Sequence, residues 1–130
     1  GQNAKIVVIS RDSASGTFEA FNELALGGAK VRQDALMQAS NQAIATVVSQ
    51  TPAAIGYVGI GYLSESVKVV AIDGVYPSKK TVISKEYKYA RPLFMYTNGE
   101  PKGVVKKYID FVTSKEGQTI VEETGFIGLK

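Results

Sequence analysis

The sequence predicts an α/β fold, a three-layer sandwich lobe with a mainly parallel sheet. Two observations lead to this fold class. Short apolar runs rich in β-branched residues, such as KIVVI at residues 5–9, are typical of strands that are buried on both faces. Between these runs lie segments whose apolar residues recur at spacings of three and four, which is typical of helices that cover a sheet. Strands that alternate with helices form parallel sheets with helices on their faces.

In the first part of the chain we expect two strands, two helices and one ambiguous segment. Residues 5–9 form the first strand, and a helix over residues 15–26 follows and ends at a pair of glycines. Residues 31–37 are ambiguous between a weak strand and a loop. A second helix over residues 40–50 stops before a proline, because the residue before proline disfavours helical geometry. Residues 54–58 form the second buried strand.

The middle of the chain contains the less regular predictions. Residues 59–64 are expected to form a loop with a short helical turn. Residues 67–72 (VKVVAI) are expected to form a third strand. Residues 76–90 are polar and irregular. Residues 91–97 (RPLFMYT) are strand-like, and their proline keeps the start of the segment out of the centre of a sheet.

Two helices are expected near the C-terminus. The first begins near Pro101 and carries an apolar stripe between Val104 and Val112. Thr113 and Glu116 have the spacing of a capping box, which places the start of the last helix at Thr113.

Composition and charge narrow the classes of function. The net charge of +3 favours a small anion, but it is too weak and too scattered to indicate nucleic-acid binding. The chain has no cysteine and no histidine, which excludes a thiol nucleophile, a thiolate metal site and a Ser-His-Asp hydrolase within it. We expect no cofactor and no metal. No apolar run is long enough for a transmembrane helix, and the first residues do not resemble a signal peptide.

The loop between the first strand and the first helix, Ser10–Thr17, is the strongest candidate for a functional site. Ligands of such sheets bind at the carboxyl ends of strands, and a helix N-terminus has free N–H groups that favour an anion. Gly16 permits a close backbone approach, while Ser15 and Thr17 add hydroxyl donors. Arg11 offers a planar fork of donors that matches an oxyanion. The loop is therefore a candidate binding site for an oxyanion.

A simpler interpretation of the same loop remains open. Serine and threonine at a helix start are often only caps, and Arg11 followed by Asp12 fits a surface ion pair. The loop lacks the Gly-Lys-Ser/Thr of a P-loop and the glycine of a nucleophile elbow. The seven tyrosines are interpreted as core and rim residues rather than as stacking platforms for a ligand.

Beyond the loop, the chain resembles the phosphate-binding proteins of phosphate ABC transporters, the PstS family. Arg11 and, after three intervening residues, Ser15-Gly16-Thr17 match that family's loop between a strand and a helix. Further similarities cover nearly the whole chain, in this order: Ala54-Ile55-Gly56-Tyr57, Arg91-Pro92-Leu93, Tyr108-Ile109-Asp110-Phe111, Glu116-Gly117-Gln118 and Gly125-Phe126-Ile127.

The resemblance implies a ligand and a role for each residue of the loop. It implies that Arg11 makes the charged contact with inorganic phosphate, and that Ser15 and Thr17 donate their hydroxyls. It also implies that the backbone N–H groups of Gly16 and Thr17 complete this half of the site. Some members carry an acidic residue two positions after the arginine, where it steadies the guanidinium. Here that position is Ser13 and the acid is Asp12, so the support of Arg11 is an open question.

The resemblance also implies the place of this chain in a larger protein. It implies a fold like that of type II periplasmic binding proteins, with residues 1–96 as the second of two lobes. Residues 97–130 are then C-terminal helices that pack on a first lobe, for which this chain has no counterpart. We expect their apolar surface to pack elsewhere or to pair with a second copy of the chain.

The function implied is the capture of phosphate and its delivery to an ABC transporter permease, without catalysis. The protein is then expected at the periplasmic or extracellular face of the membrane, with a lipid anchor as one option. Two alternatives stay open. The same fold can select another oxyanion, such as sulfate or molybdate, or it can serve as an interaction module with an idle anion site.

Overall fold

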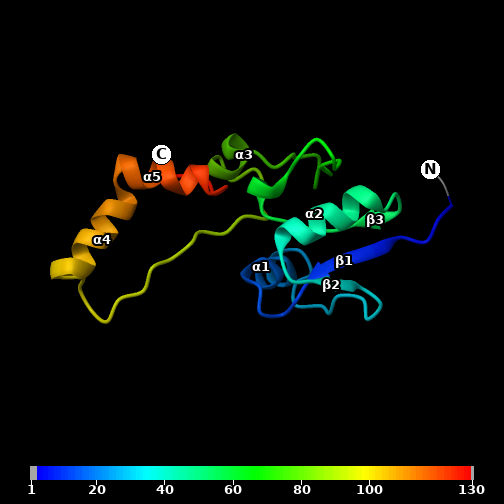
Figure 1. Ribbon diagram of the computed structural model, residues 1–130, viewed down its shortest axis with the longest axis horizontal. Helices are drawn as coiled ribbons and strands as arrows, with labels where there is room; N and C mark the ends of the chain where they lie inside the picture. The colour runs from blue at the N-terminus through cyan, green and yellow to red at the C-terminus, as the bar shows by residue number, and fades with distance from the viewer. Residues whose placement is uncertain (1–2, 130) are drawn as a thin grey trace. The chain divides into compact units, whose positions relative to one another are not determined.

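The computed structural model describes residues 3–129 and divides into two compact units. The first unit ends at Ala90, and the second begins at Arg91. Figure 1 shows their helices and strands. Among the described residues, no helix is long and apolar enough to cross a membrane.

The first unit is built on a parallel sheet of three strands (Figure 1). β1 (Val7–Arg11) lies in the centre, between β2 (Leu36–Gln38) and β3 (Ala54–Ile55). The register pairs Ile9 with Leu36 on one side and Val7 with Ala54 on the other. The ambiguous segment at residues 31–37 thus contains the start of an edge strand, and the predicted parallel sheet is confirmed.

Two helices join the strands and pack on opposite faces of the sheet. α1 (Gly16–Leu24) connects β1 to β2, and α2 (Asn41–Gln50) connects β2 to β3. The space beside Gly56 is filled by side chains of α2, whereas the ring of Tyr57 stacks on Phe21 of α1. Because neighbouring residues of an extended segment point to opposite faces, these two contacts place α1 and α2 on different sides. The result is the predicted three-layer α/β sandwich.

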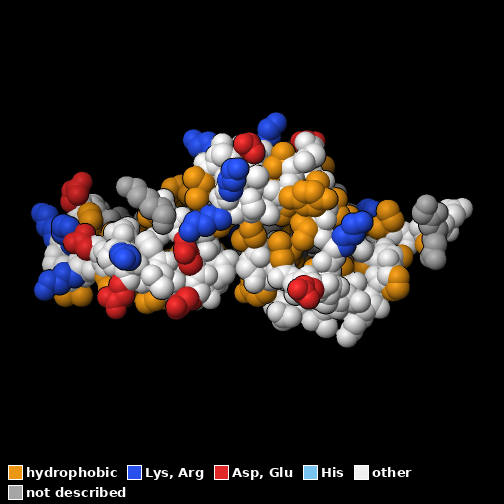
Figure 2. All heavy atoms as spheres, turned by 90° about the horizontal axis from the view of Figure 1, so that it is seen from above, with side chains coloured by type: hydrophobic (Ala, Val, Ile, Leu, Met, Phe, Trp, Pro, Cys, Tyr) orange, Lys and Arg blue, Asp and Glu red, His pale blue; other side chains and the backbone are white. Residues whose placement is uncertain are grey.

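The fully buried core of this unit lies around the middle of the sheet. Ile9 of β1 and Ile44 of α2 are its largest buried apolar side chains, and Ala45 completes it. Ser10 is also fully buried, on the central strand just before the loop. Many other large apolar side chains remain exposed, and Figure 2 shows hydrophobic side chains at the surface over the first unit.

The rest of the first unit differs from the prediction in two ways. Residues 67–72 do not form a strand; they contribute only an isolated bridge between Ile72 and Val75. The β-branched run had the right composition for a strand, but no neighbouring strand pairs with it here. The segment expected to be irregular contains a short helix, α3 (Lys79–Ile83), which begins with a capping box between Ser78 and Thr81. The predicted helical turn is the 3-10 helix η1 (Ile60–Tyr62).

The second unit is an extended segment followed by a helical hairpin. Residues 91–97 are exposed throughout and form no strand, so the prediction of a strand-like segment was wrong. α4 (Gly103–Thr113) and α5 (Lys115–Glu123) pack against each other. The cap of α5 is Ser114 rather than Thr113: the Ser114 hydroxyl accepts from the Gly117 N–H at 3.2 Å. The Thr113 hydroxyl instead donates to the Ile109 carbonyl within α4.

Candidate anion-binding site

The loop Ser10–Thr17 lies where the direction of the sheet reverses. From β1 the chain moves to β2 on one side, and it then returns past β1 to β3 on the other. In open parallel sheets a crevice forms at such a reversal, outside the carboxyl ends of the two central strands, and ligands bind there. The carboxyl end of β1 is Arg11, and the segment that leaves β3 is Gly56-Tyr57. The fold thus brings the sequence-predicted loop and a second segment to one point.

Ser15 forms the start of α1. It is 93% shielded from solvent, with a relative exposure of 7%. Its hydroxyl oxygen accepts from the N–H groups of Thr17, at 3.1 Å, and Phe18, at 3.3 Å. These contacts explain why a helix begins here, because they satisfy two of the N–H groups that a helix start leaves unpaired. They use the Ser15 oxygen as an acceptor, so its O–H is left to act as a donor.

Gly16 and Thr17 form the first residues of the same helix turn. Gly16 is exposed at the surface, and the Thr17 side chain is half-buried. The Thr17 N–H already donates to Ser15. The partial positive charge of a helix start belongs to this first turn, whose exposed residue is Gly16.

The Arg11 side chain, at the end of β1, is largely buried. It is 13% exposed, and its Nη2 donates to the Ala39 carbonyl at 3.1 Å, in the turn between β2 and α2. Its Nε is buried and has no hydrogen-bond partner among the described residues. A guanidinium held by one carbonyl and left with a buried free N–H has capacity for an additional acceptor, since an unpaired buried donor costs free energy.

Asp12 gives Arg11 little direct support. Its carboxylate approaches Arg11 Nη2 only to 3.9 Å, and its side chain is 43% exposed. At this distance, and with a carboxylate that is open to solvent, the pair contributes about 1 kcal/mol at most. The other Asp12 oxygen accepts from the Ala14 N–H at 3.0 Å, and the Asp12 carbonyl accepts from the Ser15 N–H at 3.2 Å. Asp12 therefore stabilises the turn that leads to α1, whereas the Arg11 guanidinium is hydrogen-bonded to the Ala39 carbonyl.

Sequence reasoning placed Tyr57 among the core and rim residues and missed its contact with this loop. The Tyr57 hydroxyl lies 2.8 Å from the Ser10 hydroxyl and accepts from the Arg11 N–H at 3.2 Å. Ser10 and Tyr57 are 47 residues apart, so no local pattern indicates the contact. The one available signal was the pairing of a short polar residue at a strand end with a tyrosine after the neighbouring strand.

The other arginine of this part of the chain is committed elsewhere. Arg32 binds the Asp34 carboxylate through two nitrogens, at 2.8 and 2.7 Å, and its Nη1 donates to the Ile6 carbonyl before β1. Hydrogen bonds from Arg32 and then from Lys5 hold the pKa of Asp34 well below its usual range. This ion pair lies at the amino end of the sheet, opposite Arg11.

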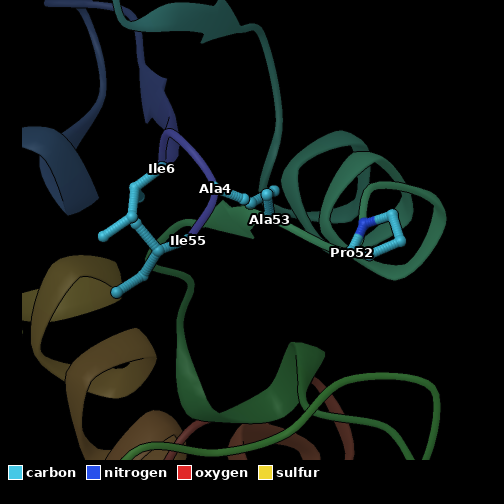
Figure 3. A pocket seen from close by; sticks show the side chains of 6 residues that line it. Ala4, Ile6, Pro52, Ala53 and Ile55 are labelled. Carbon is cyan, nitrogen blue, oxygen red and sulfur yellow. The ribbon is translucent and has the colours of Figure 1, made fainter. Parts of the chain in front are cut away.

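An apolar hollow also lies at that opposite edge (Figure 3). It is lined by Ala4, Ile6, Pro52, Ala53, Ala54 and Ile55. Figure 3 shows the Ile6 and Ile55 side chains next to each other, from the segment before β1 and from β3. No charged or hydroxyl side chain lines the hollow, so it is not suited to an anion.

Comparison with known proteins identifies the family of the chain. Residues 1–116 match the family described as the PBP superfamily domain. The chain belongs to this family. The phosphate-binding protein PstS of Borreliella burgdorferi is 39% identical to it over 143 residues, covering 100% of this chain and 51% of that protein. The chain therefore spans about half the length of the curated relatives it matches.

Two solved structures share the fold of the chain. A phosphate-binding protein of a phosphate ABC transporter from Streptococcus pneumoniae has 35% identity and a TM-score of 0.87, covering 98% of this chain and 52% of that one. The second, from Clostridium perfringens, is assigned as a substrate-binding protein of a phosphate ABC transporter and was solved with bound phosphate. It has 36% identity and a TM-score of 0.84, covering 100% and 54%. The fold is of the type II periplasmic-binding-protein class, as predicted from the sequence.

Proposed function

We propose that the loop at the carboxyl end of β1 is one half of a binding site for inorganic phosphate. Arg11 supplies the positive charge, Ser15 and Thr17 supply hydroxyl donors, and Gly16 supplies a backbone N–H at the helix start. The observation that carries the proposal is the buried Arg11 Nε, which has no partner among the described residues and belongs to the last residue of β1, where the loop to α1 begins. The choice of anion is supported by the relatives, which are named as phosphate-binding proteins.

The donors of this half-site are not equally available. The Ser15 and Thr17 O–H groups can rotate toward a phosphate oxygen, and the Arg11 Nε–H is not committed to another acceptor among the described residues. The Thr17 N–H already donates to Ser15 at 3.1 Å, so it contributes only by sharing its hydrogen between two acceptors. Arginine and hydroxyl donors to a charged oxyanion form short, strong hydrogen bonds.

Because the chain spans half of its relatives, its part in the whole protein is also a proposal. We place it as the second lobe, residues 1–96 with the C-terminal helices 97–130, of a substrate-binding protein that delivers phosphate to an ABC transporter permease. The first lobe supplies the remaining donors, and the protein works at the periplasmic or extracellular face of the membrane. The function is binding and transport, not catalysis.

A phosphate titration of the 130-residue chain, followed by NMR, tests the half-site. We expect Arg11→Ala to weaken phosphate binding by about tenfold or more, equivalent to at least ~1.4 kcal/mol. Arg32→Ala is the matched control, because Arg32 is bound to Asp34 at the opposite end of the sheet. Equal affinities for the wild type and Arg11→Ala, or an equal loss in both variants, would show that the anion binds elsewhere.

Competition in the same titration identifies the anion. If phosphate is the ligand of the site, sulfate and molybdate displace it only at higher concentration. Displacement by sulfate at equal concentration would support the alternative, a binding protein for another oxyanion. Complete absence of anion binding at high millimolar concentration would leave an interaction module with an idle site as the better description of the chain.

A further inference from the structure

The Tyr57 hydroxyl occupies the place of a missing strand partner. In β1 the N–H of Val7 points toward β3, where it donates to the Ala53 carbonyl at 3.0 Å. Alternate residues of a strand direct their N–H and C=O groups to the same neighbour, so both groups of Arg11 also face the β3 side. The register places Val58 opposite Arg11, but β3 ends at Ile55, three residues earlier. The Arg11 N–H donates to Tyr57 Oη instead, at 3.2 Å.

Ser10 completes this substitute for strand pairing. The Ser10 hydroxyl donates to the Arg11 carbonyl at 3.2 Å and lies 2.8 Å from the Tyr57 hydroxyl. Each hydroxyl has one proton. Since the Ser10 hydroxyl donates its proton to the hydrogen bond with the Arg11 carbonyl, the Tyr57 hydroxyl is the donor in the hydrogen bond between the two hydroxyls. The Arg11 N–H, the Tyr57 O–H and the Ser10 O–H thus form a closed ring of three hydrogen bonds around the Arg11 backbone.

The ring of Tyr57 links the same point to the helix that carries the other half-site donors. It stacks on the Phe21 ring of α1 with centroids 4.0 Å apart and an angle of 6° between the planes. Aromatic contacts of this kind are specific in geometry as well as favourable. One side chain therefore contacts both the strand end that directs Arg11 and the helix whose first turn holds Ser15, Gly16 and Thr17.

We propose that Tyr57 is a positioning residue of the anion site: its hydroxyl fixes the backbone of Arg11 and its ring fixes α1, so that the guanidinium and the helix start converge on one anion. The inference rests on the proposed phosphate site, to which it adds a residue outside the loop.

The test is the variant Tyr57→Phe in the 130-residue chain, because it keeps the stacked ring and removes only the hydroxyl. Tyr62→Phe, at an exposed tyrosine of η1, is the matched control. Two readouts are recorded by NMR well below the unfolding temperature: the Arg11 amide and Nε–H resonances without ligand, and the affinity for inorganic phosphate. We expect Tyr57→Phe to shift both Arg11 resonances and to weaken phosphate binding about five- to tenfold. Tyr62→Phe should change neither.

The outcomes separate this inference from the proposed function. If the wild type binds phosphate and Tyr57→Phe binds it equally tightly, Tyr57 has only a structural role and the inference is wrong. If the wild type shows no response to phosphate at Arg11, the proposed function fails and the inference fails with it. A further check is additivity: in the Arg11→Ala background, Tyr57→Phe should cause little additional loss of affinity, because Tyr57 acts through Arg11. A full additional loss would contradict that route.

If Tyr57→Phe does not fold, Ser10→Ala keeps the inference testable. It removes the hydrogen bond to the Arg11 carbonyl and the contact with the Tyr57 hydroxyl, but it does not alter the Tyr57 and Phe21 rings. We expect the same direction of change in the Arg11 resonances and a weaker affinity for phosphate. An unchanged affinity in a folded Ser10→Ala variant would overturn the inference.

Discussion

At the scale of single residues, the environment of each arginine decides what that arginine can do. Arg11 and Arg32 have the same side chain, but Arg32 is satisfied by a carboxylate with two short hydrogen bonds. Arg11 has a carbonyl on one nitrogen and a buried Nε without a partner among the described residues. A free anion is therefore expected to bind at Arg11 rather than at Arg32.

The Arg32–Asp34 pair leads to a prediction about pH. Hydrogen bonds from Arg32 and Lys5 lower the pKa of Asp34 in the folded chain, whereas the unfolded value is about 3.9. The stabilisation is thus present above that unfolded value and is lost as the pH falls toward the lower folded value. We expect Arg32→Ala to raise the pKa of Asp34, measured by carbon NMR of the carboxyl group, and to make stability less dependent on pH below pH ~4. An unchanged Asp34 pKa in this variant would contradict the assignment.

At the scale of elements, the close approach of α2 to the segment after β3 depends on Gly56. A Cβ at this position would lie 2.7 Å from Ile44 Cγ2 and 3.2 Å from Val48 Cγ2. We expect Gly56→Ala to reduce the free energy of unfolding by about 1–3 kcal/mol, because the core must shift to accept the methyl group.

Gly59 provides the matched control for that prediction. Its φ is −63°, and a Cβ there would have ordinary contacts, of which the shortest is 3.7 Å to Tyr62. Gly59→Ala should leave stability nearly unchanged in urea denaturation. A Gly56→Ala variant as stable as Gly59→Ala would mean that α2 and the segment after β3 do not pack as described.

The helical hairpin gives a second prediction at this scale. The Ser114 hydroxyl donates to the Phe111 carbonyl at 2.6 Å and accepts from the Gly117 N–H at 3.2 Å, so it joins the end of α4 to the start of α5. We expect Ser114→Ala to lower stability by ~0.5–2 kcal/mol and Thr113→Ala to lower it by less. Thermal unfolding followed by circular dichroism measures both. A larger loss of stability for Thr113→Ala would show that Thr113, as predicted from the sequence, caps α5.

The same elements show what the sequence alone could predict. Local signals worked where the physics is local: Ser15 and Ser40 cap the helices that were expected to follow them. They failed where a segment needs a distant partner. The run at residues 67–72 has strand composition but no neighbouring strand, and the role of Tyr57 depends on a residue 47 positions away. The candidate loop was predictable because strand, loop and helix start are contiguous in the chain.

At the scale of the whole molecule, large apolar side chains on the second unit lack cover. Val104 is 81% exposed and Tyr108 is 64% exposed, both on α4. An apolar helix face left in water favours association with another surface. The chain spans only about half of the length of its relatives. We therefore propose that this apolar face of α4 is the surface that another lobe covers in the complete protein.

This interpretation predicts self-association of the 130-residue chain. Light scattering should show a mass that rises with protein concentration, and Val104→Glu should reduce the effect because it places a charge on the apolar face. Lys107→Glu, on the same helix but without loss of apolar surface, is the control. A monomer at all concentrations for the unmodified chain would show that the face has no affinity for a second copy.

The most direct test of the central claim is a crystal structure of the chain grown with inorganic phosphate as the only multivalent anion. We expect phosphate at the start of α1, with an oxygen within hydrogen-bond distance of Arg11 Nε and a second oxygen at the Gly16 N–H. Phosphate bound at Arg32 or elsewhere, with Arg11 Nε still without a partner, would contradict the claim that this loop is half of a phosphate site.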